Sequence, residues 1–355
     1  MNDTTVLEDA VSGILKDYYT TDILVAAKRL GWCPELWATL QETGMTLVSV
    51  PEASGGTGGS LRDAASVVRL AGKYCAPVPL ADTALLGGWA LARAGLPVPS
   101  HPLAFAVANA KQALAVSRER GGGWRFSGTL RKVPFARFAK TLVIVSGHED
   151  ECIVASLSPA QYGIVQGTNL AAEARDDVVL DNQLVSADQV KIAPPDLSVE
   201  TAMERGALSR ALMMCGALDG ILEMSVRYTK QRVQFGRPLA KFQAIQQELA
   251  KLAGDAAIAT ACAMSAAASL GTAMQSFDVA VAKVRAGEAA QSGSMIAHQV
   301  HGAMGLTEEY PLHHSTLRIW SWRSEYGSEA QWSERLSATA IERGSRWLWD
   351  TITRY

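Results

Sequence analysis

The sequence predicts an α+β chain with a helical domain at the N-terminus, a small antiparallel β domain in the middle and an antiparallel four-helix bundle at the C-terminus. Apolar residues recur at helical spacing in the first hundred residues. They form short period-two runs between residues 103 and 180, and return to helical spacing after Pro194 and Pro195. We therefore expect domains over residues 1–100, 101–195 and 196–355.

The first domain shows helical spacing in Val6–Leu15 and Leu24–Leu30 and again around Leu36 and Leu40. Four glycines then fall within residues 55–59, which predicts a loop, because glycine is costly inside a helix. Ser60 is the expected N-cap of the next helix. A further helix is expected over about Ala81–Ala94, before the proline-rich linker at residues 97–102.

The middle domain is indicated by short apolar runs separated by Gly, Pro, Asn and Asp. The expected strands are Leu103–Val107, Trp124–Phe126, Thr141–Val145, Cys152–Leu157 and Asp177–Leu180. The bundle helices are expected over about Leu208–Val226, Leu239–Met274, Val279–Val300, and from Glu329 onward.

Composition limits the classes of function. The chain has 355 residues, 48% of them hydrophobic, and a formal net charge of -2 with no basic run, which argues against nucleic-acid binding. Five scattered cysteines without a CxxC pair favour reduced thiols in a cytoplasmic protein over disulfides or a zinc site. We expect no signal peptide and no membrane span, because no basic start followed by an apolar stretch and no run of about 18 apolar residues occurs.

Arg232, Gln234, Phe235 and Gly236 lie at a predicted corner between two long helices, where Gly236 ends one helix and Pro238 starts the next. An arginine at such a corner can offer a forked donor to a diphosphate, Phe235 can pack on an aromatic ring and Gln234 can supply a polar contact. An ordinary helix corner with a solvated arginine is the alternative.

Gln299, Gly302, Ala303 and Gly305 lie at the expected end of another long helix. The glycines let the backbone approach a ligand closely, although a glycine C-cap followed by a loop has the same pattern. The nearby histidines lack a third ligand at a suitable spacing, so we expect no metal site.

Together these two stretches resemble the acyl-CoA dehydrogenase family, in which an Arg-x-x-Phe-Gly corner and a Gln-x-x-Gly-Gly-x-Gly turn bind the diphosphate and adenosine end of FAD across a subunit interface. Residues 50–59, 123–128 and 310–312 resemble further stretches of the family, in the same order. The resemblance implies FAD-dependent α,β-dehydrogenation of an acyl-CoA. It further implies a homotetramer or a complex with a homologous subunit (α2β2), and electron transfer to an electron-transfer flavoprotein.

The catalytic base is where the sequence departs from the family. The family's glutamate, in a Tyr-Glu-Gly-Thr-like turn, aligns with Tyr326, and Glu325 stands one residue early. We predict Glu325 as the base, with an ordinary surface glutamate in a turn as the alternative. Some relatives carry the base on an earlier helix, at a position that aligns with Gly206, which makes nearby Glu204 a second candidate.

The stretch that lies beside the flavin ring in the family is also missing, because residues 102–111 lack its hydroxyl and acidic side chains. This favours one subunit of a heteromeric enzyme, similar to bacterial enzymes that act on CoA thioesters of steroid side chains. A non-catalytic subunit that completes a partner's FAD site, and a flavin oxidase or monooxygenase on the same fold, remain as alternatives.

Overall fold

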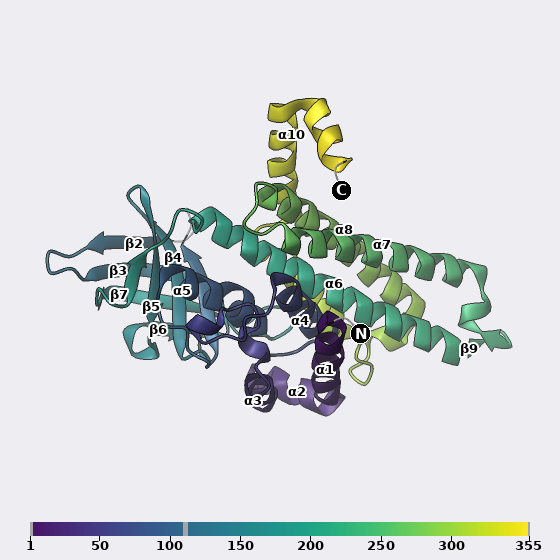
Figure 1. Ribbon diagram of the computed structural model, residues 1–355. Coiled ribbons are helices and arrows are strands. Elements are labelled where there is room, and N and C mark those ends of the chain that lie inside the picture. The colour runs from purple at the N-terminus through teal and green to yellow at the C-terminus, as the bar shows by residue number, and fades with distance from the viewer. Residues whose placement is uncertain (1–2, 109–112, 354–355) are drawn as a thin grey trace.

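The computed structural model describes residues 3–108 and 113–353. Three parts follow one another along the chain (Figure 1): N-terminal helices, a β region at one end of the molecule and long helices that extend to the other end. Helices at both ends of the chain around a β middle are the predicted arrangement, which the structure confirms.

The N-terminal helices bury their apolar faces against one another and against the bundle. Ser60 caps α4 as predicted, because its side chain accepts from the Asp63 N–H while the Asp63 carboxylate accepts from the Ser60 N–H. The elements are α1 (Asp3–Asp17), α2 (Thr21–Leu30), α3 (Pro34–Glu42), α4 (Leu61–Lys73), the π-helix η3 (Asp82–Gly87) and α5 (Gly88–Ala94), with short 3-10 turns at Met45–Leu47 and Glu52–Ser54.

The β region consists of two four-stranded sheets, ordered β1-β4-β5-β8 and β2-β3-β7-β6, which enclose an apolar core. The strands are β1 (Leu103–Ala108), β2 (Ala113–Arg118), β3 (Trp124–Pro134), β4 (Thr141–His148), β5 (Glu151–Leu157), β6 (Gly163–Val165), β7 (Arg175–Val185) and β8 (Val190–Ile192).

Two features of these sheets differ from the prediction. β1 and β4 run parallel, because the chain forms β2 and β3 of the other sheet before it returns to pair with β1. The apolar pattern also missed β2, β6 and β8, all of which lie at sheet edges. An edge strand buries few side chains, so its sequence carries little of the alternation that identifies a strand.

The C-terminal part contains α6 (Val199–Gln231), the small hairpin of β9 (Val233–Gln234) and β10 (Arg237–Pro238), a 3-10 turn (Leu239–Lys241), α7 (Gln243–Ala268), α8 (Gln275–His301), the 3-10 turn η6 (Gly302–Leu306), α9 (Leu312–Trp322) and α10 (Glu329–Ile352). The long helices α6, α7 and α8 pack side by side around a core of leucine and alanine. Among the described helices, α7 is long and apolar enough to cross a membrane, judged by length and composition alone. Core helices pass the same test. The buried face of α7 packs within the helical core, and the absence of a membrane span stays a prediction.

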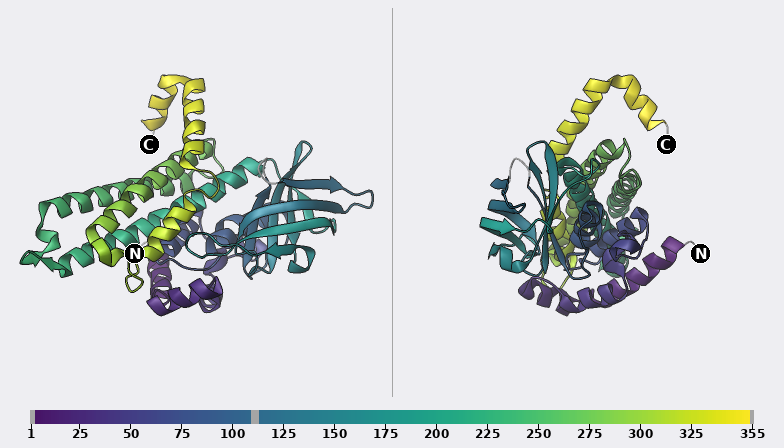
Figure 2. Two further views of the ribbon diagram at one scale, coloured as in Figure 1. Left: turned by 180° about the vertical axis from the view of Figure 1, so that it is seen from behind. Right: turned by 60° about the vertical axis from the view of Figure 1, so that its left-hand side comes forward.

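The sequence predicts that α10 is the fourth helix of the bundle, but only its first half packs on the other helices. α10 rises away from the other helices and bends back on itself (Figure 2). The bend is at Gly344, whose φ of 79° interrupts the helix. The first half of α10 still packs on the core through Trp332 and Leu336.

Candidate functional site

The two stretches that the sequence assigns to a cofactor lie at the same end of the long helices, away from the β region (Figure 1). Arg232 follows the last residue of α6, and Gln299 lies in the last turn of α8. A direct contact joins the two helix ends, because the ring of Tyr228 on α6 stacks on that of His301 on α8 with centroids 4.5 Å apart. The structure therefore brings the two stretches together, as a single binding surface requires.

The hairpin after α6 presents Arg232, Gln234 and Phe235 to the outside. Phe235 and Gly236 form its tip, and both have positive φ (53° and 76°), as in the tight turns that suit hairpins. A bulky residue seldom adopts such a φ, so this conformation is held at a cost. Phe235 is 91% exposed, and its ring meets that of Phe242 edge to face with the ring centroids 6.2 Å apart.

The turn after α8 leaves backbone open to an approaching group. Gly302 has a φ of 59°, and a Cβ placed on it would meet nothing within 4 Å. Gln299, Gly302 and Ala303 are exposed, whereas Gly305 is buried. A Cβ on Gly305 would lie 3.0 Å from both His301 and Leu312, so a larger residue there would force these neighbours to shift.

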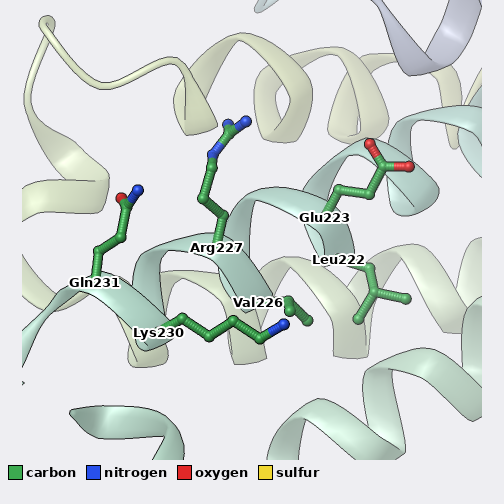
Figure 3. A pocket seen from close by; sticks show the side chains of 6 residues that line it. All are labelled: Leu222, Glu223, Val226, Arg227, Lys230 and Gln231. Carbon is green, nitrogen blue, oxygen red and sulfur yellow. The ribbon is translucent and has the colours of Figure 1, made fainter.

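These residues fit the diphosphate end of a dinucleotide such as FAD. Arg232 supplies a planar cation, Gln234 and Gln299 supply amide donors, the open Gly302 backbone allows close approach, and Phe235 offers an exposed aromatic face. A groove of about 560 Å³ runs along the same end of α6 (Figure 3). Leu222 and Val226 make its apolar part, and the polar residues are Glu223, Arg227, Lys230 and Gln231.

The carboxylate of Glu325, the predicted base, is not free, because two arginines bind it. Its two carboxylate oxygens accept from Arg175 Nε at 2.7 Å and from Arg210 Nε at 2.6 Å, and the side chain is 18% exposed. Burial alone would raise the pKa of Glu325, but the two guanidinium groups overcome it and lower the pKa to about 2. A carboxylate held ionised by two cations is a poor proton acceptor near neutral pH, and this geometry argues against Glu325 as the base.

Glu325 is one member of a set of six side chains of alternating charge, and the other five are buried. Arg210 also donates to Asp82 at 3.0 Å, and Arg175 also donates to Glu173 at 3.0 Å. Arg318 then donates to Glu173 at 3.1 Å. The order Asp82–Arg210–Glu325–Arg175–Glu173–Arg318 alternates acid and base and joins η3, α6, the loop after α9, the β region and α9. We call these six side chains the interdomain ion-pair network.

The position that aligns with the family's base holds an aromatic ring instead of a carboxylate. The Tyr326 ring packs directly on Gly206 of α6, where a Cβ would lie 2.2 Å from the Tyr326 Cδ1 atom. The Arg210 guanidinium lies 5.2 Å from the centroid of the same ring. Burial raises the pKa of the Tyr326 hydroxyl well above its usual range, so Tyr326 stays neutral. Both positions where relatives carry the base are therefore in contact, and neither provides a carboxylate.

Glu204, the second candidate, is 1% exposed near the start of α6. It accepts from the Gln275 amide at 2.6 Å and from the Ser276 hydroxyl, and burial raises its pKa. These contacts fix the start of α8 to α6. The carboxylate points to that helix start, and both of its oxygens are occupied.

The sequence analysis did not identify Asp82, Glu173, Arg175, Arg210 or Arg318 as site residues. Arg210 was the available signal, because it interrupts an apolar stretch of α6 with a charge that must be paired. No spacing rule identifies its partners, which come from distant segments. Among the described residues, no group of three His, Cys, Asp or Glu side chains is placed to hold a metal ion.

Comparisons with known proteins concern the family and the fold of the chain. Family models match residues 4–97 ("Acyl-CoA dehydrogenase, N-terminal domain") and residues 197–330 ("Acyl-CoA dehydrogenase, C-terminal domain"). The chain is 27% identical to acyl-CoA dehydrogenase IpdE2 of Mycolicibacterium smegmatis over 86% of this chain and 89% of that protein. It is 26% identical to FadE27 of Mycobacterium tuberculosis over 79% of this chain and 80% of that protein.

Among solved structures, the fold is similar to a chain of the ChsE4-ChsE5 complex from Mycobacterium tuberculosis, with a TM-score of 0.89 and 22% identity over 96% of this chain and 98% of that chain. It is also similar to a chain of the Tcur3481-Tcur3483 steroid ACAD, with a TM-score of 0.82 and 24% identity over 96% and 98% of the two chains. At these identities the likeness shows the fold.

Proposed function

The chain belongs to the acyl-CoA dehydrogenase family of oxidoreductases, and we propose that it is one subunit of an FAD-dependent hetero-oligomer that dehydrogenates an acyl-CoA. In this proposal a homologous partner chain supplies the catalytic base and holds the flavin ring and the thioester. This chain supplies Arg232, Gln234, Phe235 and the turn from Gln299 to Gly305, which bind the diphosphate end of the cofactor.

The observation that carries the proposal is the packing of Tyr326 on Gly206. The family's reaction needs a carboxylate that removes the α-proton of the thioester, while bound FAD supplies the acceptor for the hydride that leaves the β-carbon. Here a neutral ring fills the space at the two base positions, and the carboxylate of Glu325, the adjacent residue, is held by two arginines. A complete site in a partner chain reconciles this arrangement with an intact surface for the diphosphate.

Two further facts support a partner and a class of substrate. The relatives of similar fold include the ChsE4-ChsE5 complex and the Tcur3481-Tcur3483 steroid ACAD, each named for two different chains. By analogy, we propose an acyl-CoA that carries a steroid. An electron-transfer flavoprotein remains the proposed electron acceptor.

Flavin content tests the proposal directly. The chain is produced alone and together with a homologous dehydrogenase chain, and flavin and protein are quantified in each preparation. We expect no acyl-CoA-reducible flavin in the chain alone, and half as many flavins as chains in the complex. A yellow homo-oligomer of this chain alone that is bleached by an acyl-CoA would overturn the proposal.

Replacing Arg232 tests the cofactor surface. In the complex, R232A should release FAD at concentrations where the wild type retains it, because a charge-assisted pair to the diphosphate is lost. R285A is the matched control, since Arg285 lies on α8 in an exposed ion pair with Glu288 whose loss costs little. Equal flavin retention in R232A and R285A would contradict the assignment of Arg232.

A further inference from the structure

Three aromatic side chains cluster behind the two cofactor stretches. The rings of Tyr228, His301 and Tyr310 lie with centroids 4.5 Å (Tyr228–His301), 4.9 Å (His301–Tyr310) and 5.8 Å (Tyr228–Tyr310) apart. They come from α6, from the last residue of α8 and from the loop before α9. His301 is 2% exposed, so the imidazole sits inside the cluster.

Hydrogen bonds fix the orientation of each ring. His301 Nδ1 lies 2.8 Å from the Ala297 carbonyl oxygen, which can only accept, so Nδ1 carries the proton. Burial lowers the pKa of His301, and the ring is therefore neutral near pH 7 with Nε2 as an acceptor. The Tyr310 hydroxyl donates to that Nε2 at 3.1 Å, and the Tyr228 hydroxyl donates to the His301 carbonyl at 3.2 Å.

This cluster holds both cofactor stretches by direct contacts. The hydrogen bond between His301 and Tyr310 joins the two ends of the loop over residues 302–309. The first residue of this loop is Gly302, whose backbone is open to an approaching group. On the other side, the backbone N–H of Arg232 donates to the Tyr228 carbonyl at 2.8 Å. A continuous path of hydrogen bonds therefore runs from the Arg232 backbone through Tyr228 to His301 and Tyr310.

We propose that Tyr228, His301 and Tyr310 are positioning residues, which set the Arg232 corner and the Gln299–Gly305 turn at the separation that one dinucleotide requires. The inference rests on the proposed function, because it concerns the same cofactor surface. A surface that is fixed before binding loses less conformational freedom when the ligand arrives, and its affinity is higher for that reason. If the three rings served core packing alone, they would contribute to the stability of the fold. Removing the tyrosine hydroxyl groups would then leave the affinity for the cofactor unchanged.

The test removes hydroxyl groups and keeps the rings. Y228F, Y310F and the double variant are prepared in the hetero-oligomeric complex, the flavin is removed, and FAD binding is titrated by flavin fluorescence. We expect each single variant to weaken FAD binding roughly three- to tenfold, the effect of about one hydrogen bond, and the double variant to weaken it further. Hydrogen–deuterium exchange of residues 302–309 in the flavin-free complex should become faster in the same order.

Y162F is the matched control, because the Tyr162 hydroxyl of the β region is buried without a hydrogen-bond partner among the described residues. It should leave both FAD affinity and exchange of residues 302–309 unchanged. If R232A loses FAD while Y228F, Y310F and the double variant bind it as the wild type does, the positioning role is wrong and the proposed function stands. If the wild-type complex binds no FAD, the proposed function itself fails.

Discussion

The Tyr326 ring occupies the space that a side chain at position 206 would need. A Cβ on Gly206 would lie 2.2 Å from Tyr326 Cδ1 and 2.4 Å from Cε1, closer than such atoms can approach. The two residues are separated by most of the C-terminal region in sequence and belong to α6 and the loop before α10. The Tyr326 ring can therefore pack in this place only because residue 206 is a glycine.

This relationship predicts the effect of G206A. The added methyl group must displace the partly buried Tyr326 ring, and we expect a loss of about 1–3 kcal/mol in the free energy of unfolding, as for other overpacked cores. G254A is the control, since a Cβ on Gly254 of α7 meets nothing within 4 Å and alanine favours a helix by about 1 kcal/mol. Urea unfolding measures both, and a G206A variant as stable as G254A would contradict this packing.

The position of Glu325 predicts how E325Q affects turnover. In a complex whose partner supplies the base, E325Q should keep turnover within about tenfold once the complex has assembled with its flavin. Loss of a general base typically costs 10² to 10⁴ in rate. Steady-state kinetics on complexes of equal flavin content decide between the two. A loss of a thousandfold with assembly and flavin intact would restore Glu325 as the base.

The same variant has a predicted pH signature in stability. The pKa of Glu325 falls from 4.5 to about 2 in the folded chain, so its stabilising contribution is complete above pH 4.5 and is lost as the pH falls toward 2. A shift of this size corresponds to about 3 kcal/mol. Acid unfolding of the wild type should therefore be steeper than that of E325Q between these pH values, and parallel profiles would contradict the ionised state of Glu325.

The sequence predicted the elements that bury enough apolar side chains to leave a recognisable pattern. The helices from α1 to α8 have one buried face at helical spacing, whereas the central strands β4 and β5 are buried on both faces and were recognised as short, continuous apolar runs. The edge strands β2, β6 and β8 and the departure of α10 from the bundle were missed. Few buried residues mark an edge, and the kink at Gly344 depends on one backbone angle.

The candidate site was predicted only in part, for a related reason. The corner at Arg232 and the turn after Gln299 are local patterns, and local patterns can be read from a sequence. The partners of Glu325 cannot, because Arg175 and Arg210 lie 150 and 115 residues away and only the packing of the β region on α6 and α9 brings them together. The sequence thus located the carboxylate, while its charge state depends on tertiary structure.

Lys283 gives a second pH prediction, of the same direction but in the alkaline range. Its side chain is 0% exposed and its Nζ donates to the carbonyls of Trp322 and Arg323 at 3.0 Å, at the end of α9. Burial is the main cause that lowers its pKa from 10.5 to about 7, with Glu325 and Glu329 opposing it and Arg210 and Arg323 adding to it. The folded chain therefore binds fewer protons than the unfolded chain between pH 7 and 10.5, and its stability rises with pH over that range.

K283M should remove this rise. The difference in unfolding free energy between the wild type and K283M should shift in favour of the wild type by on the order of 3–5 kcal/mol from pH 7 to 10.5. Taking the difference cancels the contribution of the other groups that titrate in this range. Urea unfolding at several pH values measures it, and a constant difference would mean that Lys283 stays charged in the folded chain.

Phe235 separates the requirements of binding from those of folding. The residue is 91% exposed with a φ of 53°, so it adds little to the core and its backbone is strained. F235G removes that strain at the cost of a more flexible unfolded chain, and we expect its stability to be within about 1 kcal/mol of the wild type or above it. FAD binding to the complex should nevertheless weaken by roughly tenfold, because an aromatic contact is lost.

Ile341 on α10 is 83% exposed, and I341A should change neither property. FAD titration beside thermal unfolding checks both expectations. Unchanged FAD affinity in F235G would mean that the strained hairpin tip serves some other contact.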